Sequence, residues 1–234
     1  MRAVILAGGK GTRLAPYTTV LPKPLMPVGE MPILELLIRS LARAGITRIS
    51  LATGYLSSLI MAFFGDGAAF GVDIEYSLED VPLGTAGPLR LIGGLDETFL
   101  VMNGDLLTDL DLAAMIDAHR RTGAVATVGT YRRDLRIDLG VIEADEEHRV
   151  RRYIEKPTHH FLVSMGVYVL EPAVLERIPE GTRFDLPDLI GSLLEAGQEV
   201  GSFEHPGYWL DIGRPEDYEQ AQADVELIKG RVLG

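Results

Sequence analysis

The chain begins MRAVILAGGKGTRL (residues 1–14), and this stretch indicates the type of fold. Ala3 to Ala7 form an unbroken apolar run, which is typical of a strand covered on both faces. The run ends in the glycine-rich stretch Gly8 to Gly11. Glycines tolerate unusual backbone dihedrals and leave main-chain N–H groups open to an anion. The stretch therefore predicts a buried strand that leads into a phosphate-binding loop.

Two better-known glycine loops fit this stretch poorly. A P-loop requires a glycine five residues before the pair Gly9-Lys10, and Val4 stands there. A dinucleotide fingerprint that starts at Gly9 matches Gly11 but requires a third glycine where Leu14 stands. An NAD-dependent oxidoreductase is therefore disfavoured, and it would show itself by tight binding of NAD.

Apolar periodicity then alternates between strands and helices up to about residue 123, which predicts an α/β fold with a mainly parallel sheet flanked by helices. The ligands of such sheets bind at the carboxyl ends of the strands. After about residue 124 the pattern changes to short strands, which indicate a small β-rich subdomain or lid. The predicted strands are 48–53, 74–77, 99–102, 124–131, 140–144, 150–154, 163–170, 200–203 and 208–210; the predicted helices are 33–44, 56–64, 85–92, one capped by Asp111, 187–196 and one from Pro215.

Composition limits the classes of partner. The 234 residues carry a net charge of −12 and no long basic stripe, so a nucleic-acid partner is not expected. The chain contains no cysteine, and the apolar run at its start is too short for a signal peptide or a membrane span. We expect a cytoplasmic protein of one domain with no membrane partner, and the sequence leaves a homo-oligomer open.

Several polar residues follow predicted strands or stand in stiff turns. Lys23 lies between two prolines, which fix the backbone around its charge. Asp105 follows the strand that ends at Met102, and Asp211 follows another strand. Two carboxylates together with phosphate oxygens make a suitable Mg²⁺ site. Glu155-Lys156-Pro157 places an acid beside a base, and Gly84-Thr85 forms a turn that suits a base or ribose.

The motifs LAGGKGTRL, PKPL, LGTAGPL, NGD, EKP and WLDIGRPEDY occur in an order and spacing that resembles the nucleotide-sugar pyrophosphorylase family. The resemblance spans nearly the whole chain and looks closest to mannose-1-phosphate guanylyltransferase-like members. It implies a Rossmann-like, GT-A-like nucleotidyltransferase fold, with a nucleotide-binding half over about 1–123 and a sugar-phosphate-binding half over about 124–234 of a single domain.

The resemblance also implies roles for individual residues. The nucleotide would lie over Leu6, Gly8, Gly9, Gly11, Thr12, Gly84, Thr85 and Asn103, and the sugar phosphate near Gly140, Glu155, Lys156 and Ser164. Ser164 departs from the asparagine that is frequent in the family. An oxygen of the sugar 1-phosphate would attack the α-phosphorus of a nucleoside triphosphate and displace pyrophosphate. Asp105 and Asp211 would hold Mg²⁺, Arg13 and Lys23 would neutralise the triphosphate, and Lys156 would hold the sugar phosphate.

Specificity is less constrained than the reaction. GTP and mannose 1-phosphate are favoured; thymidylyl or uridylyl transfer to glucose 1-phosphate, guanylyl transfer to a heptose or cyclitol phosphate, and a non-catalytic nucleotide-sugar sensor stay as alternatives. The chain ends soon after the helix from Pro215, without hexapeptide repeats, so no acyltransferase domain is expected. His159 and His160 are interpreted as a solvated loop, the arginines 132, 133 and 136 as a solvated charge run, and Trp209 as core or as a neighbour of the metal site.

Overall fold

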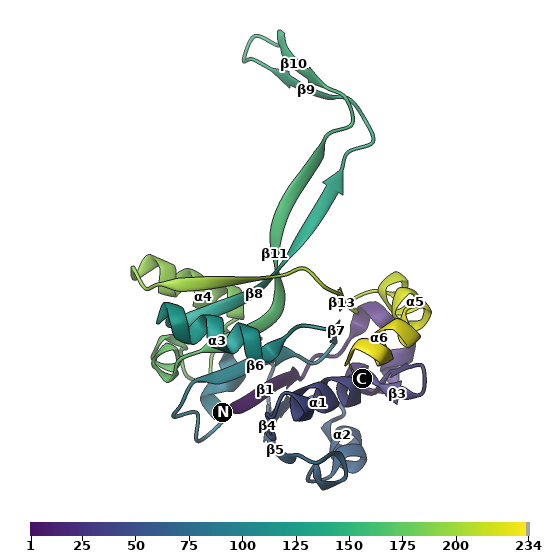
Figure 1. Cartoon of the computed structure of the whole chain (residues 1–234), viewed down its shortest axis with the longest axis vertical. Coiled ribbons are helices and arrows are strands. Elements are labelled where there is room, and N and C mark those ends of the chain that lie inside the picture. The colour runs from purple at the N-terminus through teal and green to yellow at the C-terminus, as the bar shows by residue number, and fades with distance from the viewer. Residues whose placement is uncertain (233–234) are drawn as a thin grey trace.

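The computed structural model describes residues 1–232, and these form a central seven-stranded sheet with a long arm (Figure 1). Across the sheet the strands follow the order β12 (Val200–His205), β8 (Ala126–Arg136), β11 (Thr158–Leu170), β6 (Phe99–Asn103), β1 (Arg2–Ala7), β4 (Arg48–Thr53) and β5 (Asp73–Leu78). Every neighbouring pair in this described sheet is parallel except the two that involve β11. The predicted mainly parallel sheet is confirmed.

The first strand shows why the sheet needs cover on both faces. Ala3 and Ile5 of β1 pack into one core with α1 (Ile33–Arg43), α2 (Ser57–Phe64) and α3 (Leu112–Thr122). Val4 packs into a second core with α4 (Leu186–Glu195) and the 3₁₀ turns Gly87–Leu91 and Pro172–Arg177. A strand covered on both faces has no side exposed to water. Polar and apolar residues therefore do not alternate along it, and its sequence is a continuous apolar run.

A third core joins the end of the chain to its beginning. β13 (Trp209–Asp211) pairs with β7 (Leu106–Thr108), and α5 (Pro215–Ala223) and α6 (Val225–Val232) pack beside them. Ile212 and Ile228 lie buried against Leu14 and Ile33 in this core. The short strands β2 (Pro27–Val28) and β3 (Met31–Pro32) and the 3₁₀ turns Thr12–Leu14, Tyr17–Thr19, Lys23–Leu25 and Ala68–Phe70 complete the body. In the described residues, no helix is both long and apolar enough to cross a membrane.

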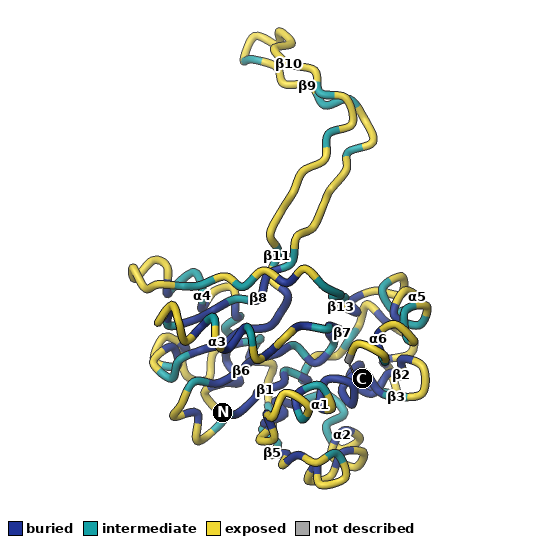
Figure 2. The backbone as a smooth tube through the Cα atoms, in the orientation of Figure 1, coloured by how far each residue is buried: buried dark blue, intermediate teal, exposed yellow. Residues whose placement is uncertain are grey.

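The arm, defined here as residues 132–162, leaves the body where β8 and β11 run past the edge of the other strands. It ends in the hairpin of β9 (Val141–Ala144) and β10 (Val150–Ile154), which Figure 1 shows far from the helices. None of residues 132–162 is buried, and the tube in Figure 2 is almost wholly coloured as exposed along the arm. A two-stranded ribbon has no core of its own, so this part of the chain lacks the cover that the body provides.

Two local predictions need correction. The predicted helix 85–92 is a 3₁₀ turn over Gly87–Leu91, because the N–H groups of Leu89 and Ile92 donate to the carbonyls three residues earlier, of Ala86 and Leu89 (3.0 and 3.4 Å). His159 and His160 lie in strand β11 instead of a loop, and both are exposed. The arginines 132, 133 and 136 are exposed on the facing strand, as predicted.

Candidate active site

A cleft of about 710 Å³ lies at the carboxyl ends of β1, β4, β5 and β6. Its position is that expected for ligands of a parallel sheet. The cleft brings together most of the predicted nucleotide-binding residues with Asp105. Its lining is Leu6, Gly8, Gly9, Lys10, Ala52, Gly54, Tyr55, Glu79, Asp80, Pro82, Gly84, Thr85, Pro88, Asn103, Asp105, Arg183 and Asp185.

The glycine loop is held in place by side chains behind it. Gly11 has a φ of +61°, and a Cβ atom there would lie 2.9 Å from Thr18 Cγ2, so the position requires glycine. The hydroxyl of Thr18 donates to the carbonyl of Gly11 (2.8 Å). A Cβ atom on Gly8 would lie 2.5 Å from Glu79 Oε1, across the cleft floor. Gly8 and Gly9 line the cleft directly, whereas Gly11 and Thr12 continue the loop beside it.

The second predicted turn is tied to the start of α4. The N–H of Thr85 donates to Asp185 Oδ1 (2.9 Å), and the hydroxyl of Thr85 accepts from the N–H of Leu186 (2.7 Å). Gly84 has a φ of +81°, and a Cβ atom there would come within 2.7 Å of the carbonyl oxygen of Phe184. These contacts fix one wall of the cleft across a separation of about a hundred residues in the chain.

Sequence reasoning missed several residues of the cleft lining, among them the charged Glu79, Arg183 and Asp185. Burial raises the pKa of Glu79, although its carboxylate accepts a hydrogen bond from the N–H of Leu83. Asp185 precedes a helix with Pro187 in its first turn, and this pattern marks a helix start but carries no signal for a ligand. The packing of α4 against the turn at Gly84 brings Arg183 and Asp185 to the cleft, whereas Glu79 follows the end of β5.

Asp105 and Asp211 are neighbours, as predicted. β13 pairs antiparallel with β7 so that Asp211 lies opposite Leu106, and the N–H of Ile212 donates to the carbonyl of Asp105 (3.1 Å). The ammonium group of Lys23, which is buried, forms an ion pair and hydrogen bond with Asp105 Oδ2. Two strand ends and the proline-framed turn therefore converge on one point.

The charges at this point suit a divalent cation. Asp105 Oδ1 is buried and has no hydrogen-bond partner among the described residues. Partial burial raises the pKa of Asp211, and the negative charge of Asp105 raises it further against the opposing effects of Lys23 and Arg13. A cation between the carboxylates would give the unpaired Oδ1 of Asp105 a partner. It would also offset the repulsion between the charges of Asp105 and Asp211. No group of three or more His, Cys, Asp or Glu side chains is arranged for a metal among residues 1–232. One or two carboxylates together with water and phosphate oxygens are a common Mg²⁺ ligand set.

Arg13 and Trp209 flank the same point. A Cβ atom on Gly213 would lie 3.3 Å from the Arg13 guanidinium, so this glycine leaves room for the arginine beside the turn after Asp211. Trp209 donates from Nε1 to the carbonyl of Met165 (3.0 Å) and packs against Tyr131 with ring centroids 5.3 Å apart. Trp209 thus has the predicted core role and also lies two residues before Asp211.

None of the four predicted sugar-phosphate residues belongs to the cleft lining. Gly140, Glu155 and Lys156 gather at the bend of the arm, where Gly140 packs against Tyr153, and Tyr153 Oη donates to Glu155 Oε2 (3.2 Å). Lys156 has a φ of +44°, a left-handed conformation that is uncommon outside glycine. Ser164 lies at the base of the arm, where its Oγ is 2.9 Å from Tyr168 Oη. One chain does not bring the residues at the bend of its arm to its own cleft.

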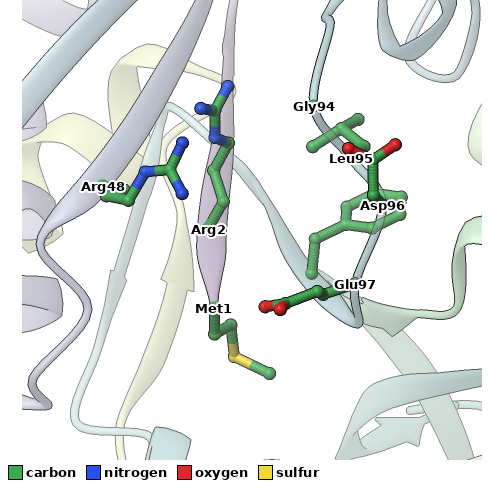
Figure 3. A pocket seen from close by; sticks show the side chains of 8 residues that line it. Met1, Arg2, Arg48, Gly94, Leu95, Asp96 and Glu97 are labelled. Carbon is green, nitrogen blue, oxygen red and sulfur yellow. The ribbon is translucent and has the colours of Figure 1, made fainter.

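A smaller pocket of about 220 Å³ lies at the opposite edge of the sheet, at the amino ends of β1 and β4 (Figure 3). Arg2 and Arg48 stand on one side of it, and Asp96 and Glu97 on the other. The Arg2 guanidinium is already held by Glu75 Oε2 (2.8 Å) and the carbonyl of Gly93 (3.1 Å). Because charges of both signs face each other and Arg2 already has partners, this pocket offers no free positive site for an anion among the described residues.

A protein-family model described as nucleotidyl transferase matches residues 2–227. The chain belongs to the nucleotidyl transferase family. The mannose-1-phosphate guanylyltransferase of Mycobacterium tuberculosis is 39% identical over 236 residues, which are 97% of this chain and 65% of that protein. The UTP–glucose-1-phosphate uridylyltransferase of Synechocystis is 36% identical over 241 residues, which are 94% of this chain and 62% of that protein. This nucleotidyl transferase chain therefore spans about two thirds of the length of these relatives.

Solved structures of the same fold agree with this assignment. HddC from Yersinia pseudotuberculosis matches with a TM-score of 0.74 and 26% identity, covering 96% of this chain and 99% of that one. Its complex with GMP-PN matches with a TM-score of 0.73 and 25% identity over the same shares. The nucleotidyl transferase fold predicted from the resemblance is thereby confirmed.

Proposed function

We propose that this protein transfers a nucleoside monophosphate from a nucleoside triphosphate to a sugar 1-phosphate and releases pyrophosphate. The observation that carries the proposal is the convergence of Asp105, Asp211 and Lys23 beside a glycine loop at the carboxyl edge of the sheet. Phosphoryl-type transfer needs positioned cations more than a protein nucleophile, and this edge offers them.

Each residue of the cleft has a task in this proposal. The N–H groups around Gly8, Gly9 and Gly11 hold the triphosphate, and the base and ribose lie over Gly84, Thr85 and Asn103. Arg13 and Lys23 neutralise the charge that develops on the pyrophosphate as the bond from the α-phosphorus to its leaving oxygen breaks. Because Lys23 is buried and paired with Asp105, little reorganisation of this cation accompanies the reaction.

Mg²⁺ fits the pair Asp105 and Asp211, whose orphaned oxygen and raised pKa indicate a missing positive charge. When bound, it would neutralise phosphate oxygens and orient the α-phosphate for in-line attack. Lys156 supplies the charge that holds the sugar phosphate, and Glu155, Gly140 and Ser164 lie near the sugar. The attacking oxygen belongs to the sugar phosphate itself, so no side chain becomes covalently modified.

For specificity we propose GTP and mannose 1-phosphate. Support comes from the relative that is a mannose-1-phosphate guanylyltransferase and from the GMP-PN complex of a similar structure. A uridylyltransferase for glucose 1-phosphate is nearly as similar, so UTP or dTTP with glucose 1-phosphate is the second candidate. Guanylyl transfer to a heptose or cyclitol phosphate is a third, because Ser164 replaces the frequent asparagine.

The test is pyrophosphate release from GTP, UTP, dTTP, ATP and CTP, each paired with mannose, glucose and a heptose 1-phosphate. We expect Mg²⁺-dependent release that is strongest with GTP and mannose 1-phosphate, together with formation of the nucleotide sugar. Release with another pair would correct the specificity alone. Absence of release with every pair, together with measurable binding of a nucleotide sugar, would replace transfer by the sensor function.

A further inference from the structure

The stem of the arm has one mainly apolar face, which also carries Arg133 and His159, and one mainly charged face, which also carries Leu162. Within the ladder of β8 and β11, Tyr131 pairs with Val163, Arg133 with Phe161 and Leu135 with His159, so these six side chains share a face. The other face carries Arg132, Asp134 and Arg136 opposite Leu162, His160 and Thr158. The first face begins in the body, where Tyr131 packs on Trp209, and continues outward as Leu135 and Phe161, which are 55% and 52% exposed.

The charged face already has its partners. Arg132 pairs with Glu204 (3.0 Å), Arg136 with Asp138 (3.0 Å), and His160 Nδ1 lies 2.6 Å from Asp134. Nothing in the described chain covers Leu135 and Phe161 in the same way. An antiparallel ribbon can leave one face in water, but its apolar face needs a surface to pack on.

The stem also keeps the bend of the arm away from its own body. Pairing is continuous from Thr130 and Ser164 to Arg136 and Thr158, so the ribbon leaves the sheet without a break. Six residue steps along β11 correspond to about 20 Å of extended chain. At the base, Gly166 is packed so closely on Asn103 that a side chain there would clash. Folding the arm back onto its own cleft would break this ladder.

The bend carries the residues that the proposed reaction lacks in the cleft. Gly140 and Glu155 both contact Tyr153 there, and Lys156 follows Glu155, whereas the cleft lining holds Gly8, Gly9 and Asp105. A cleft that needs these residues can receive them from another copy of the same chain. Twofold symmetry would then complete two sites at once, because each copy gives an arm and receives one.

We propose that the protein is a reciprocal dimer in which the arm of each copy packs its apolar face on the other and places Lys156 at the other's cleft. The proposal rests on the proposed function for the role of Lys156, but the dimer itself is independent of activity. The apolar face is then buried between the copies, and every active site is shared by two chains.

The first experiment measures mass by sedimentation velocity over a range of protein concentrations. We expect the wild type at twice the 25.5 kDa mass of one chain. Leu135→Ser should weaken the dimer by about tenfold or more, since symmetry repeats each change twice. Leu162→Ser is the matched control, because Leu162 is 54% exposed on the same ribbon but lies on the charged face. A monomeric wild type, or equal behaviour of the two variants, overturns the proposal.

The second experiment asks which copy supplies Lys156. Asp105→Ala and Lys156→Ala chains with different affinity tags are co-expressed, and dimers that carry both tags are purified. In a shared site, one of the two sites is intact and the other has both changes, so about half of the wild-type activity returns. If each site belongs to one chain, the mixed dimer shows only the mean activity of the two parents, measured at a sugar 1-phosphate concentration below the wild-type KM, where the Lys156→Ala parent is nearly inactive.

The controls separate failure of this inference from failure of the proposed function. If the wild type is inactive but still forms the Leu135-dependent dimer, the proposed transfer reaction is refuted and the proposed dimer is retained. If the wild type is active but the mixed dimer regains no activity, the exchange of arms is refuted and the proposed transfer reaction is retained. Full activity of the Lys156→Ala parent removes Lys156 from the site and overturns the delivery of this residue by the arm.

Discussion

The body and the arm use the same two strands in opposite ways. In the body, β11 reads MGVYVL over residues 165–170 and all six residues are buried, because helices cover one face and α4 with its neighbours covers the other. In the arm the same strand reads THHFL over 158–162, and every residue is exposed. The comparison teaches that the body is complete as one chain, whereas the arm is built for a surface that one chain does not provide.

The chemistry is divided along the same line. The body holds Gly8, Gly9 and Asp105 in its cleft, and the buried Lys23 and the strand pairing of Asp211 lie beside Asp105. The bend of the arm holds Gly140, Glu155 and Lys156 in solvent, where single ion pairs contribute little to stability. Changes in the body should therefore alter stability or nucleotide chemistry, and changes in the arm should alter the use of the sugar phosphate.

The largest expected effect is in the cleft. Asp105→Ala should lower kcat by about 10²- to 10³-fold, because it removes a preorganised charge where the metal and Lys23 meet. Steady-state pyrophosphate release at saturating substrates measures it. Asp73→Ala, at the exposed start of β5, is the control and should keep wild-type kcat. Normal turnover of Asp105→Ala would remove this residue from the reaction.

Lys156→Ala tests the role of the arm, because it should change KM for the sugar phosphate and KM for the nucleotide differently. A charged hydrogen bond of about 1.5–3 kcal/mol corresponds to a rise of about 10- to 100-fold in KM for the sugar phosphate. KM for the nucleotide should stay within about twofold, since that substrate is held by the body. Arg136→Ala removes another exposed cation of the arm and should change neither constant. An equal rise in both constants would contradict the division of labour.

Two glycine substitutions, one in the body and one in the arm, compare how tightly these two regions are packed. A Cβ atom on Gly104 would lie 2.8 Å from the carbonyl oxygen of Leu6, a backbone atom in the middle of the sheet. Gly104→Ala should therefore cost about 2 kcal/mol in unfolding free energy, a fall of about 4–8 °C in Tm. Gly140→Ala meets only the exposed end of the Tyr153 side chain, which can move aside, so its Tm should equal that of the wild type. A lower Tm for Gly140→Ala would show that the arm is as tightly packed as the body.

The smallest effect concerns the tie between the sheet and the last helix. Burial alone would raise the pKa of Asp109, but hydrogen bonds from Arg231, the N–H of Tyr208 and His205 together lower it below 3.8. A lowered pKa in the folded state gives stability above pH 3.8 that is lost as the pH falls through the folded value. Asp109→Asn should therefore lower Tm by about 2–4 °C at pH 7 and by less near pH 3.

Thermal unfolding followed by circular dichroism at both pH values measures this difference. Asp73→Asn serves as the control because Asp73 is exposed at the start of β5. A Tm difference between the wild type and Asp109→Asn that is equal at pH 7 and pH 3 would show that the charge of Asp109 does not contribute.

Much of the fold followed from local patterns. The run from Ala3 to Ala7, the helix capped by Asp111 and the amphipathic stretch from Ile33 all form the predicted elements. Residues 85–92 were predicted as a helix because apolar spacing alone does not separate an α-helix from a 3₁₀ turn. Strands β8 and β11 are longer than predicted, since pairing with each other extends them through polar residues.

Local chemistry, such as a glycine that accepts a positive φ or a lysine stiffened by prolines, can be read from neighbouring residues because its causes are steric and lie within a few bonds. The meeting of Asp105 with Asp211, the arrival of Arg183 and Asp185 at the cleft and the direction of the arm depend on segments about thirty to a hundred residues apart. Those contacts arise only when burial of apolar faces brings distant strands and helices together, so the tertiary structure alone decided them.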